Sequence, residues 1–224
     1  MTSDQIDRIA VRYPTAGAWD RFHLRHRLRL CPYDELLPHL PERGAVLDVG
    51  CGFGLLGWFL ADTRPALDYW GADVDARKIA LARLAFQRHP AGDRAAHLHA
   101  GDVVTWTERP DRLAAVAVLD VLYLLPLPLQ RALFDACCSL LEPGGRLLLK
   151  ILPPLRGRAR WRTWAQESLM VHVLRKTQGS GAIFASQDPT LYAGWGRERG
   201  LDCREVPLPT APPSTLLVLR RQEA

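Results

Sequence analysis

The stretch VLDVGCGFGLLGWFL, residues 46–60, places three glycines at alternate positions between two apolar runs. The first run has the β-branched character of a buried strand, and the run after Gly54 has the pattern of a helix. Glycine lacks a Cβ, so a turn built from it can adopt left-handed dihedrals and lets a ligand come close to the backbone. In an open α/β sheet, the turn after the first strand commonly contributes to the ligand crevice. The stretch therefore predicts a ligand-binding turn.

Short apolar runs alternate with helical patterns from Gly44 onward, which is typical of βα units that build a parallel sheet with helices on both faces. Seven strands are predicted, beginning at Ala45, Leu67, Ala96, Ala114, Arg146, Leu201 and Thr215. The proline-rich segment PLPTAPPST joins the last two strands too closely for a helical crossover, so we expect an antiparallel final hairpin. The predicted fold is α/β: a seven-stranded, mostly parallel, doubly wound sheet with an antiparallel last strand and helical caps.

Two helices have clear boundaries in the sequence. DARKIALARLAFQRH is predicted to begin at Asp75, which serves as its N-cap. LPLQRALFDACCSLLEPGG is predicted to end on Pro143, Gly144 and Gly145, directly before a strand. Residues 1 to about 40 are predicted to form an N-terminal helical cap. Residues 41–224 are predicted to form the main domain, with a cap insertion at about 153–181 that is helical from 161 to 176.

The composition is that of an ordinary globular protein. Of 224 residues, 48% are apolar and 24% are charged, and no uncharged apolar run is long enough to span a membrane. The first twenty residues carry acids and lack a continuous apolar core, so a cytoplasmic location is expected. The cysteines form no C-x-x-C pair and no zinc spacing, and we expect reduced thiols. They are Cys31, Cys51, Cys137, Cys138 and Cys203.

The net charge of +5 is carried almost entirely by arginine, because the chain has only three lysines. Basic residues concentrate in residues 21–30, RFHLRHRLRL, and 155–162, LRGRARWR. These segments could meet phosphates, acidic lipid headgroups or an anionic substrate, or they could simply be solvated faces. Both interpretations stay open.

The glycine spacing separates two ligand classes. A dinucleotide fingerprint, G-x-G-x-x-G, needs a third glycine at the position of Leu55, so a nicotinamide dehydrogenase is disfavoured. With Asp48 in front, the observed D-x-G-x-G-x-G resembles the first motif of the class I S-adenosylmethionine-dependent methyltransferases, which have a Rossmann-like fold. The segments GADVD, AGDVV, VLDVLYLLP and LEPGGRLLL occur where this family has its later motifs. The resemblance covers residues 44–151 well and the last two strands loosely.

The resemblance implies S-adenosylmethionine as the cofactor, S-adenosylhomocysteine as the product, and a set of binding residues. Asp73 would accept from the ribose hydroxyls, Asp102 from the adenine amine, and Asp48 would help to hold the ammonium. Asp120 could touch the cofactor through its backbone, orient a substrate or merely end a strand. The implied cofactor-binding residues are Asp48, Gly50, Cys51, Gly52, Gly54, Asp73, Val74, Asp102, Val103 and Asp120.

The catalytic groups are less defined. Methyl transfer is an in-line displacement that depends mainly on positioning, and a base is needed only for a nucleophile that still carries its proton. Candidates are Tyr123, Asp120 and His26, and the capping segments also offer Tyr13, His23 and His172. Residues of these types in such positions are more often structural than catalytic. A carboxylate cluster of the kind used by metal-dependent members is not found after the fourth strand, so we expect no metal.

The segment after the fourth strand bears on the acceptor. It has DVLY where enzymes acting on base nitrogens usually show N/D-P-P-Y/F, and Cys137 and Cys138 lie within a predicted helix rather than in a nucleophile context. A small-molecule or lipid-like biosynthetic acceptor is therefore predicted, acidic or carrier-bound, in a pocket lined by the caps. The cap side chains could instead only pack on the sheet. An RNA or protein methyltransferase and a non-catalytic, cofactor-binding adaptor are the alternatives, and the oligomeric state stays open.

Overall fold

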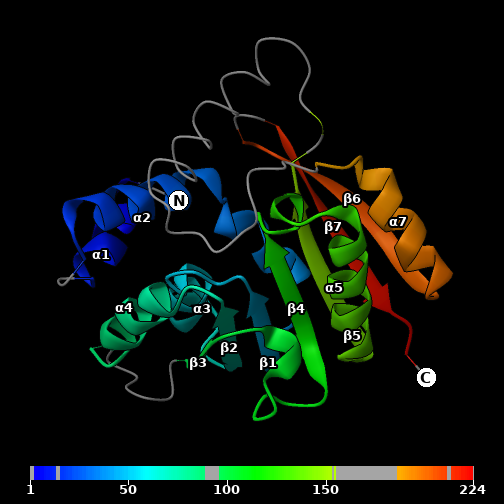
Figure 1. The fold of residues 1–224 in the computed structure, drawn as a ribbon, viewed down its shortest axis with the longest axis horizontal. Helices are drawn as coiled ribbons and strands as arrows, with labels where there is room; N and C mark the ends of the chain where they lie inside the picture. Colours follow the sequence, from blue (N-terminus) through cyan, green and yellow to red (C-terminus); the bar gives the residue numbers. More distant parts are fainter. Residues whose placement is uncertain are drawn as a thin grey trace.

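The computed structural model describes residues 3–13, 16–88, 96–152, 154, 186–210 and 213–223. The predicted cap insertion, including the helix expected over 161–176 and His172, lies almost wholly outside these residues. Figure 1 shows one twisted sheet with helices on both faces.

The sheet has seven strands in the order β3-β2-β1-β4-β5-β7-β6. Strands β1 to β5 pair in parallel, whereas β7 is antiparallel to both β5 and β6. The predicted antiparallel last strand and hairpin are therefore confirmed. The bounds are β1 (Gly44–Val49), β2 (Leu67–Asp73), β3 (His97–Ala100), β4 (Leu113–Leu119), β5 (Leu141–Ile151), β6 (Leu201–Leu208) and β7 (Ser214–Arg221).

Helices precede, connect and cover these strands. The α-helices are α1 (Ser3–Val11), α2 (Ala18–Leu30), α3 (Leu55–Thr63), α4 (Ala76–Phe86), α5 (Leu127–Ser139) and α7 (Pro189–Glu198). Short 3₁₀ turns are η1 (Tyr33–Glu35), η2 (Leu37–His39), η4 (Val103–Thr105) and η5 (Leu122–Leu124). Asp75 caps α4 as predicted, because its carboxylate accepts from the backbone N–H groups of Arg77 and Lys78 at 3.1 and 3.2 Å.

Alternate residues of the central strands pack into two separate cores. Val46 of β1 faces a core shared with α1, α2, α3 and α4, whereas the next residue, Leu47, faces a core shared with α5 and α7. All seven residues of β4 are buried, which explains why its sequence is apolar without alternation. The helices thus bury both faces of the sheet (Figure 1).

Two predictions about connections are wrong. The helix expected to end at Pro143 ends at Ser139, and the strand begins at Leu141. Gly144 and Gly145 lie in an irregularity within β5, where the pairing with β4 shifts register. A Cβ at Gly145 would lie 2.9 Å from the carbonyl oxygen of Leu113, so the close approach of the strands requires glycine there. In addition, only the turn η4 connects β3 to β4, where the alternation had predicted a helix.

Helix α7 is an element that the sequence prediction missed. Its N-cap is Asp188, whose carboxylate accepts from the backbone N–H of Thr190 at 2.9 Å, and Pro189 occupies the first helical position. Gly200 follows its end with a φ of +68°. These are ordinary start and stop signals, so the helix was readable from the sequence.

Candidate functional site

The strand order reverses between β1 and β4, and a ligand crevice in an open α/β sheet lies beyond the carboxyl ends of the strands at such a point. The glycine turn, residues 50–54, follows β1 at this position. The backbone N–H groups of Gly50 and Cys51 donate to the carbonyl oxygen of Ala72 at 2.8 and 3.0 Å. These bonds fix the turn against the end of β2.

The three glycines of the turn all have left-handed backbone conformations, with φ of +72° at Gly50, +56° at Gly52 and +70° at Gly54. A Cβ at Gly50 would collide with the Val121 side chain, and one at Gly54 would lie 2.9 Å from Phe86. A Cβ at Gly52 would meet no atom closer than 3.8 Å. Glycine is therefore required at positions 50 and 54 because any side chain would clash with a packed neighbour. At Gly52 there is room for a side chain, so its absence leaves the surface next to Asp73 open.

Two predicted binding carboxylates lie at neighbouring strand ends. Asp73 ends β2, and its two oxygens accept from the backbone N–H groups of Gly52 and Asp75, each at 2.8 Å. Asp102 follows β3 and accepts from the N–H of Val104 at 2.9 Å. Val74 and Val104 are 53% and 57% exposed beside them. The edge thus presents carboxylate acceptors flanked by apolar side chains.

Asp48 lies beneath the turn and is almost completely buried. The hydroxyl of Tyr69, on the neighbouring strand, donates to its Oδ2 at 2.9 Å. Burial and, to a smaller extent, the nearby Asp73 carboxylate raise the pKa of Asp48 to about 7, against the opposing effects of the Tyr69 hydrogen bond and the Arg27 charge. Asp48 is therefore a carboxyl group that titrates near neutral pH.

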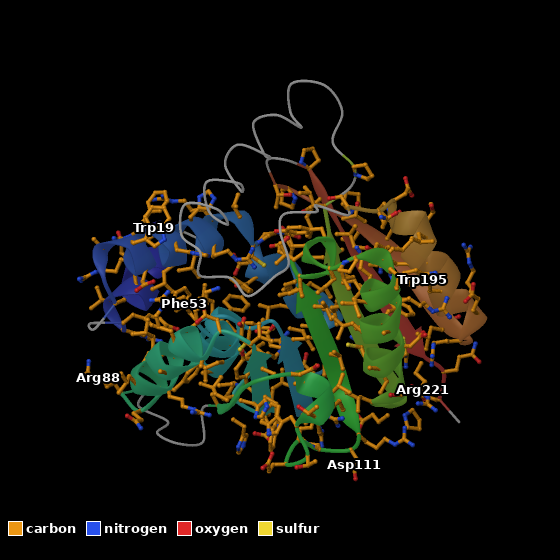
Figure 2. All side chains as sticks on the ribbon, in the orientation of Figure 1. Trp19, Phe53, Arg88, Asp111, Trp195 and Arg221 are labelled. Atoms are coloured by element: carbon orange, nitrogen blue, oxygen red, sulfur yellow. The ribbon has the colours of Figure 1, made fainter. Side chains whose placement is uncertain are left out.

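The N-terminal segment packs directly on the glycine turn. The buried Tyr13 donates its hydroxyl to the carbonyl oxygen of Phe53 at 2.6 Å, and Figure 2 shows Phe53 between this segment and the sheet. The His23 ring meets Phe53 edge-on, 5.8 Å between centroids. Burial and the charges of Lys78 and Arg27 lower the pKa of His23 to about 4, so this ring is neutral at physiological pH. Tyr13 has a structural hydrogen bond here.

Asp120, which follows β4, is held by two cations. Lys150 Nζ lies 2.8 and 2.7 Å from its two carboxylate oxygens, and Arg27 Nη1 donates to Oδ2 at 2.9 Å. Lys150 also donates to the carbonyl oxygen of Leu30 at 3.1 Å. Asp120 is the one non-glycine residue of the described chain with a positive φ, 59°. Its carboxylate is therefore engaged in an ion-pair network that joins β4, β5 and α2.

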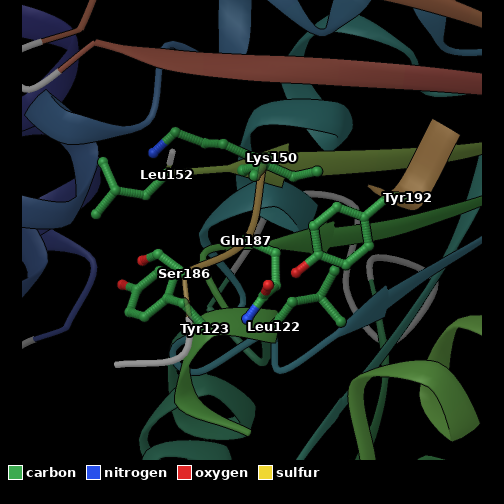
Figure 3. A pocket seen from close by; sticks show the side chains of 8 residues that line it. Leu122, Tyr123, Lys150, Leu152, Ser186, Gln187 and Tyr192 are labelled. Atoms are coloured by element: carbon green, nitrogen blue, oxygen red, sulfur yellow. The ribbon is translucent and has the colours of Figure 1, made fainter. Parts of the chain in front are cut away.

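The remaining catalytic candidates differ in their surroundings. Tyr123 lines a narrow hollow at the carboxyl ends of β4 and β5 (Figure 3). The other lining residues are Leu122, Lys150, Ile151, Leu152, Ser186, Gln187 and Tyr192. The His26 ring is stacked on Phe22 with 6.0 Å between centroids. Of the three candidates, Tyr123 is the one that lines this hollow.

Sequence reasoning missed several residues of this region. Arg27 and Lys150 were not identified as partners of Asp120, nor Tyr69 as the partner of Asp48. Lys150 did carry a signal, because it is the one charged residue within the apolar run LLLKIL, residues 147–152, and a buried lysine requires a partner. Arg27 and Tyr69 carried none, since their contacts depend on the tertiary fold.

The arrangement fits an adenosyl cofactor. Asp73 and Asp102 offer acceptors for hydroxyl and amine groups, Val74 and Val104 offer apolar contacts for a base, and Gly52 has no side chain to fill the space beside Asp73. Buried Asp48 lies behind the turn. Among the described residues, no group of three or more His, Cys, Asp or Glu side chains could hold a metal ion. No helix in this part of the chain is long and apolar enough to cross a membrane.

Comparisons with known proteins identify the family. Residues 46–145 match a family described as Methyltransferase domain. The chain is 33% identical over 211 residues to a ubiquinone biosynthesis O-methyltransferase of Xylella fastidiosa, covering 90% of this chain and 79% of that protein. It is 32% identical over 142 residues to a ribosomal RNA small subunit methyltransferase G of Acidothermus cellulolyticus, covering 63% of this chain and 55% of that protein.

The fold is also that of a solved methyltransferase. The crystal structure of a magnesium protoporphyrin IX methyltransferase from Synechocystis PCC 6803 with bound SAH matches with a TM-score of 0.67 and 20% identity. The match covers 98% of this chain and 95% of that one. From the glycine turn, the strand order and these similarities, the chain belongs to the class I S-adenosylmethionine-dependent methyltransferases and is an enzyme of that family.

Proposed function

We propose that the protein transfers a methyl group from S-adenosylmethionine to an oxygen of a small, lipid-like acceptor. The observation that carries the acceptor class is the similarity to a ubiquinone biosynthesis O-methyltransferase over 90% of this chain. The chain is also 25% identical over 221 residues to a ubiquinone biosynthesis O-methyltransferase of Cronobacter sakazakii. The acceptor experiment described below distinguishes methylation of oxygen from methylation of nitrogen or carbon.

The proposed cofactor contacts follow from the strand ends. When bound, S-adenosylmethionine supplies the electrophilic methyl group. Asp73 would accept from the ribose hydroxyls and Asp102 from the adenine amine, with the backbone N–H of Val103 beside it. Gly50, Cys51, Gly52 and Gly54 would leave backbone exposed to the methionine portion, and Val74 would contact the base. Asp48 lies behind this turn, where its carboxylate would favour a nearby ammonium group.

The proposed acceptor site lies at the ends of β4 and β5. Tyr123 lines the hollow there, and the Asp120, Lys150 and Arg27 network borders it with one surplus positive charge. A positive field of this kind favours an acceptor in its anionic form, and a phenol would then need little help from a base. Asp120 is assigned a positioning role, because both of its oxygens already accept from Lys150.

The proposed division of the chain places residues 1–40 as a cap on the domain formed by 41–224. Tyr13, His23 and Arg27 all reach from the cap to the crevice. A cytoplasmic location remains a prediction.

The experiment that tests cofactor use is thermal unfolding with S-adenosylhomocysteine, S-adenosylmethionine and NAD at matched concentrations. At 100 times its dissociation constant, a ligand adds about 2.7 kcal/mol, or roughly 5 to 10 °C for a chain of this size. We expect a shift with the adenosyl ligands alone. No shift with them, or an equal shift with NAD, would contradict the proposed site.

The acceptor is tested with purified enzyme, S-adenosylmethionine and matched phenol, amine and carbon-acid acceptors, with the methylated product identified by mass spectrometry. Methylation of phenols alone supports the proposal. The similarity to a ribosomal RNA methyltransferase and the exposed arginines make RNA the second candidate. Methylation of ribosomal RNA, with binding that weakens steeply between low and moderate salt, would replace the small-molecule assignment.

A further inference from the structure

Helix α2 presents an aromatic ridge on the side away from the sheet. Leu24 and Leu28 face the core, whereas Trp19 and Phe22 are 38% and 53% exposed. The Trp19 and Phe22 rings lie 5.3 Å apart, and the Phe22 and His26 rings are stacked at 6.0 Å. Partial burial, together with Arg27 and Arg29, lowers the pKa of His26, so its ring is neutral at physiological pH. The three rings form a continuous apolar ridge with no charge of its own.

A basic ridge runs beside these rings, made of Arg21, Arg25 and Arg29 at helical spacing. Arg25 pairs with Asp7 at 3.1 Å. Arg21 and Arg29 are exposed and have no carboxylate partner among the described residues. The one acid of α2, Asp20, is bound by both carboxylate oxygens to Arg77 at 2.8 and 2.7 Å, so it does not offset the ridge. The ends of the basic ridge are therefore two guanidinium groups without a carboxylate partner among the described residues.

This combination fits a lipid surface better than a protein partner. Tryptophan and phenylalanine rings settle at the boundary between headgroups and acyl chains, and arginines beside them attract anionic headgroups. Trp19 lies on the outside of a peripheral helix, as Figure 2 shows, and the exposed Phe22 ring lies next to it. A ridge can sink into a fluid boundary, whereas a protein partner would have to supply a matching groove.

We propose that the outer face of α2 docks the enzyme on membranes that contain anionic lipids, with Trp19 and Phe22 in the interfacial layer and Arg21 and Arg29 at the headgroups. The same helix carries His23 and Arg27 on its inner side, next to the glycine turn and Asp120. Docking through α2 would therefore bring the crevice close to the lipid surface. The proposal goes beyond methyl transfer and can be measured without any turnover.

The test is flotation of the purified full chain with vesicles of phosphatidylcholine, with and without phosphatidylglycerol. We expect binding to the phosphatidylglycerol vesicles only, weakened by salt. Arg21→Glu should lower the affinity about 30-fold, because each arginine near an anionic surface contributes about 1 kcal/mol and the substitution changes two charges. Arg43→Glu is the matched control, since Arg43 is exposed and precedes β1, at the opposite end of that strand from the glycine turn. It should bind as the wild type does.

The aromatic ridge is tested by the double variant Trp19→Ala, Phe22→Ala, which should lower vesicle affinity by at least about 10-fold. Its control is Leu129→Ala, because Leu129 is 54% exposed on α5. All variants should keep the thermal shift with S-adenosylhomocysteine, so loss of docking is distinguishable from failure of the cofactor site. No vesicle binding, equal binding to both vesicles, or binding to poly-glutamate in place of vesicles would overturn the proposal.

Discussion

Lys150 Nζ lies within 2.8 Å of both carboxylate oxygens of Asp120, and the two side chains are only 5% and 7% exposed. Removing charges from water is costly, so the pair is tolerated because each remaining donor or acceptor also has a partner. Arg27 donates to the same carboxylate from α2, and Lys150 donates to the carbonyl oxygen of Leu30 at the end of that helix. The pair therefore fastens the N-terminal cap to the carboxyl edge of the sheet.

Lys150→Met should lower the free energy of unfolding by about 3 to 5 kcal/mol, because it leaves the buried carboxylate of Asp120 with Arg27 alone. Urea denaturation at neutral pH measures this difference. The double variant Lys150→Met, Asp120→Asn should regain part of the loss, since the buried carboxylate is then neutral and the remaining charge, on Arg27, has a side chain that is 26% exposed to water. A single variant within about 1 kcal/mol of the wild type would mean that the network contributes little to stability.

Asp73→Ala should weaken S-adenosylhomocysteine binding by about 1.5 to 3 kcal/mol, the loss of hydrogen bonds to a charged group. The structure provides a matched control two residues later. Asp75 caps α4, so Asp75→Ala should cost about 1 kcal/mol of stability and leave binding nearly unchanged. Calorimetric titration of both variants separates these effects. A larger binding loss at Asp75 would show that the assignment of the β2 end is wrong.

Much of the fold was predictable because each strand carries its own local signal. The apolar run of β4, the cap at Asp75 and the glycine turn after β1 all depend on neighbouring residues. The prediction that helix α5 continues to Pro143 was wrong because the local sequence there is ambiguous. Leu140 and Leu141 suit a helix or a strand equally, and Leu141 is instead paired with Leu113 in the sheet. A local pattern cannot reveal that pairing.

The site was predictable only in part. Asp73 and Asp102 could be placed because strand ends of a parallel sheet share one edge. The hydrogen bond from Tyr13 to Phe53 spans forty positions of the chain, and the one from Arg27 to Asp120 spans 93. Such contacts depend on how the N-terminal helices dock, which no local pattern encodes. The sequence therefore predicted which residues lie at the strand ends better than which side chains of the N-terminal helices pack over them.

Gly50→Ala should lower the free energy of unfolding by about 2 to 4 kcal/mol, because alanine is strained at a φ of +72° and its Cβ would collide with Val121. Gly194→Ala is the contrasting control. Gly194 lies within α7, and a Cβ there would meet no atom within 4 Å. Alanine should raise stability there by about 0.5 to 1 kcal/mol. Thermal unfolding of the two variants should give shifts of opposite sign, and equal shifts would contradict the described turn geometry.

Asp48→Asn should make stability less dependent on pH. The folded pKa of Asp48 is about 7, above its ordinary value near 4, so the native state binds a proton that the unfolded chain has already released between these values. The stabilisation from this group is fully present below about pH 4 and is lost as pH rises toward 7. Asparagine stays neutral and can still accept from the Tyr69 hydroxyl. As pH rises from about 4 to 7, the free energy of unfolding of the variant should therefore rise relative to that of the wild type by up to about 4 kcal/mol. Above about pH 7 the difference should stay constant. Urea denaturation of both proteins at about pH 4.5, 5.5, 6.5 and 7.5 measures the difference. A difference that does not change with pH would show that Asp48 is ionised throughout and that the Tyr69 hydrogen bond outweighs its burial.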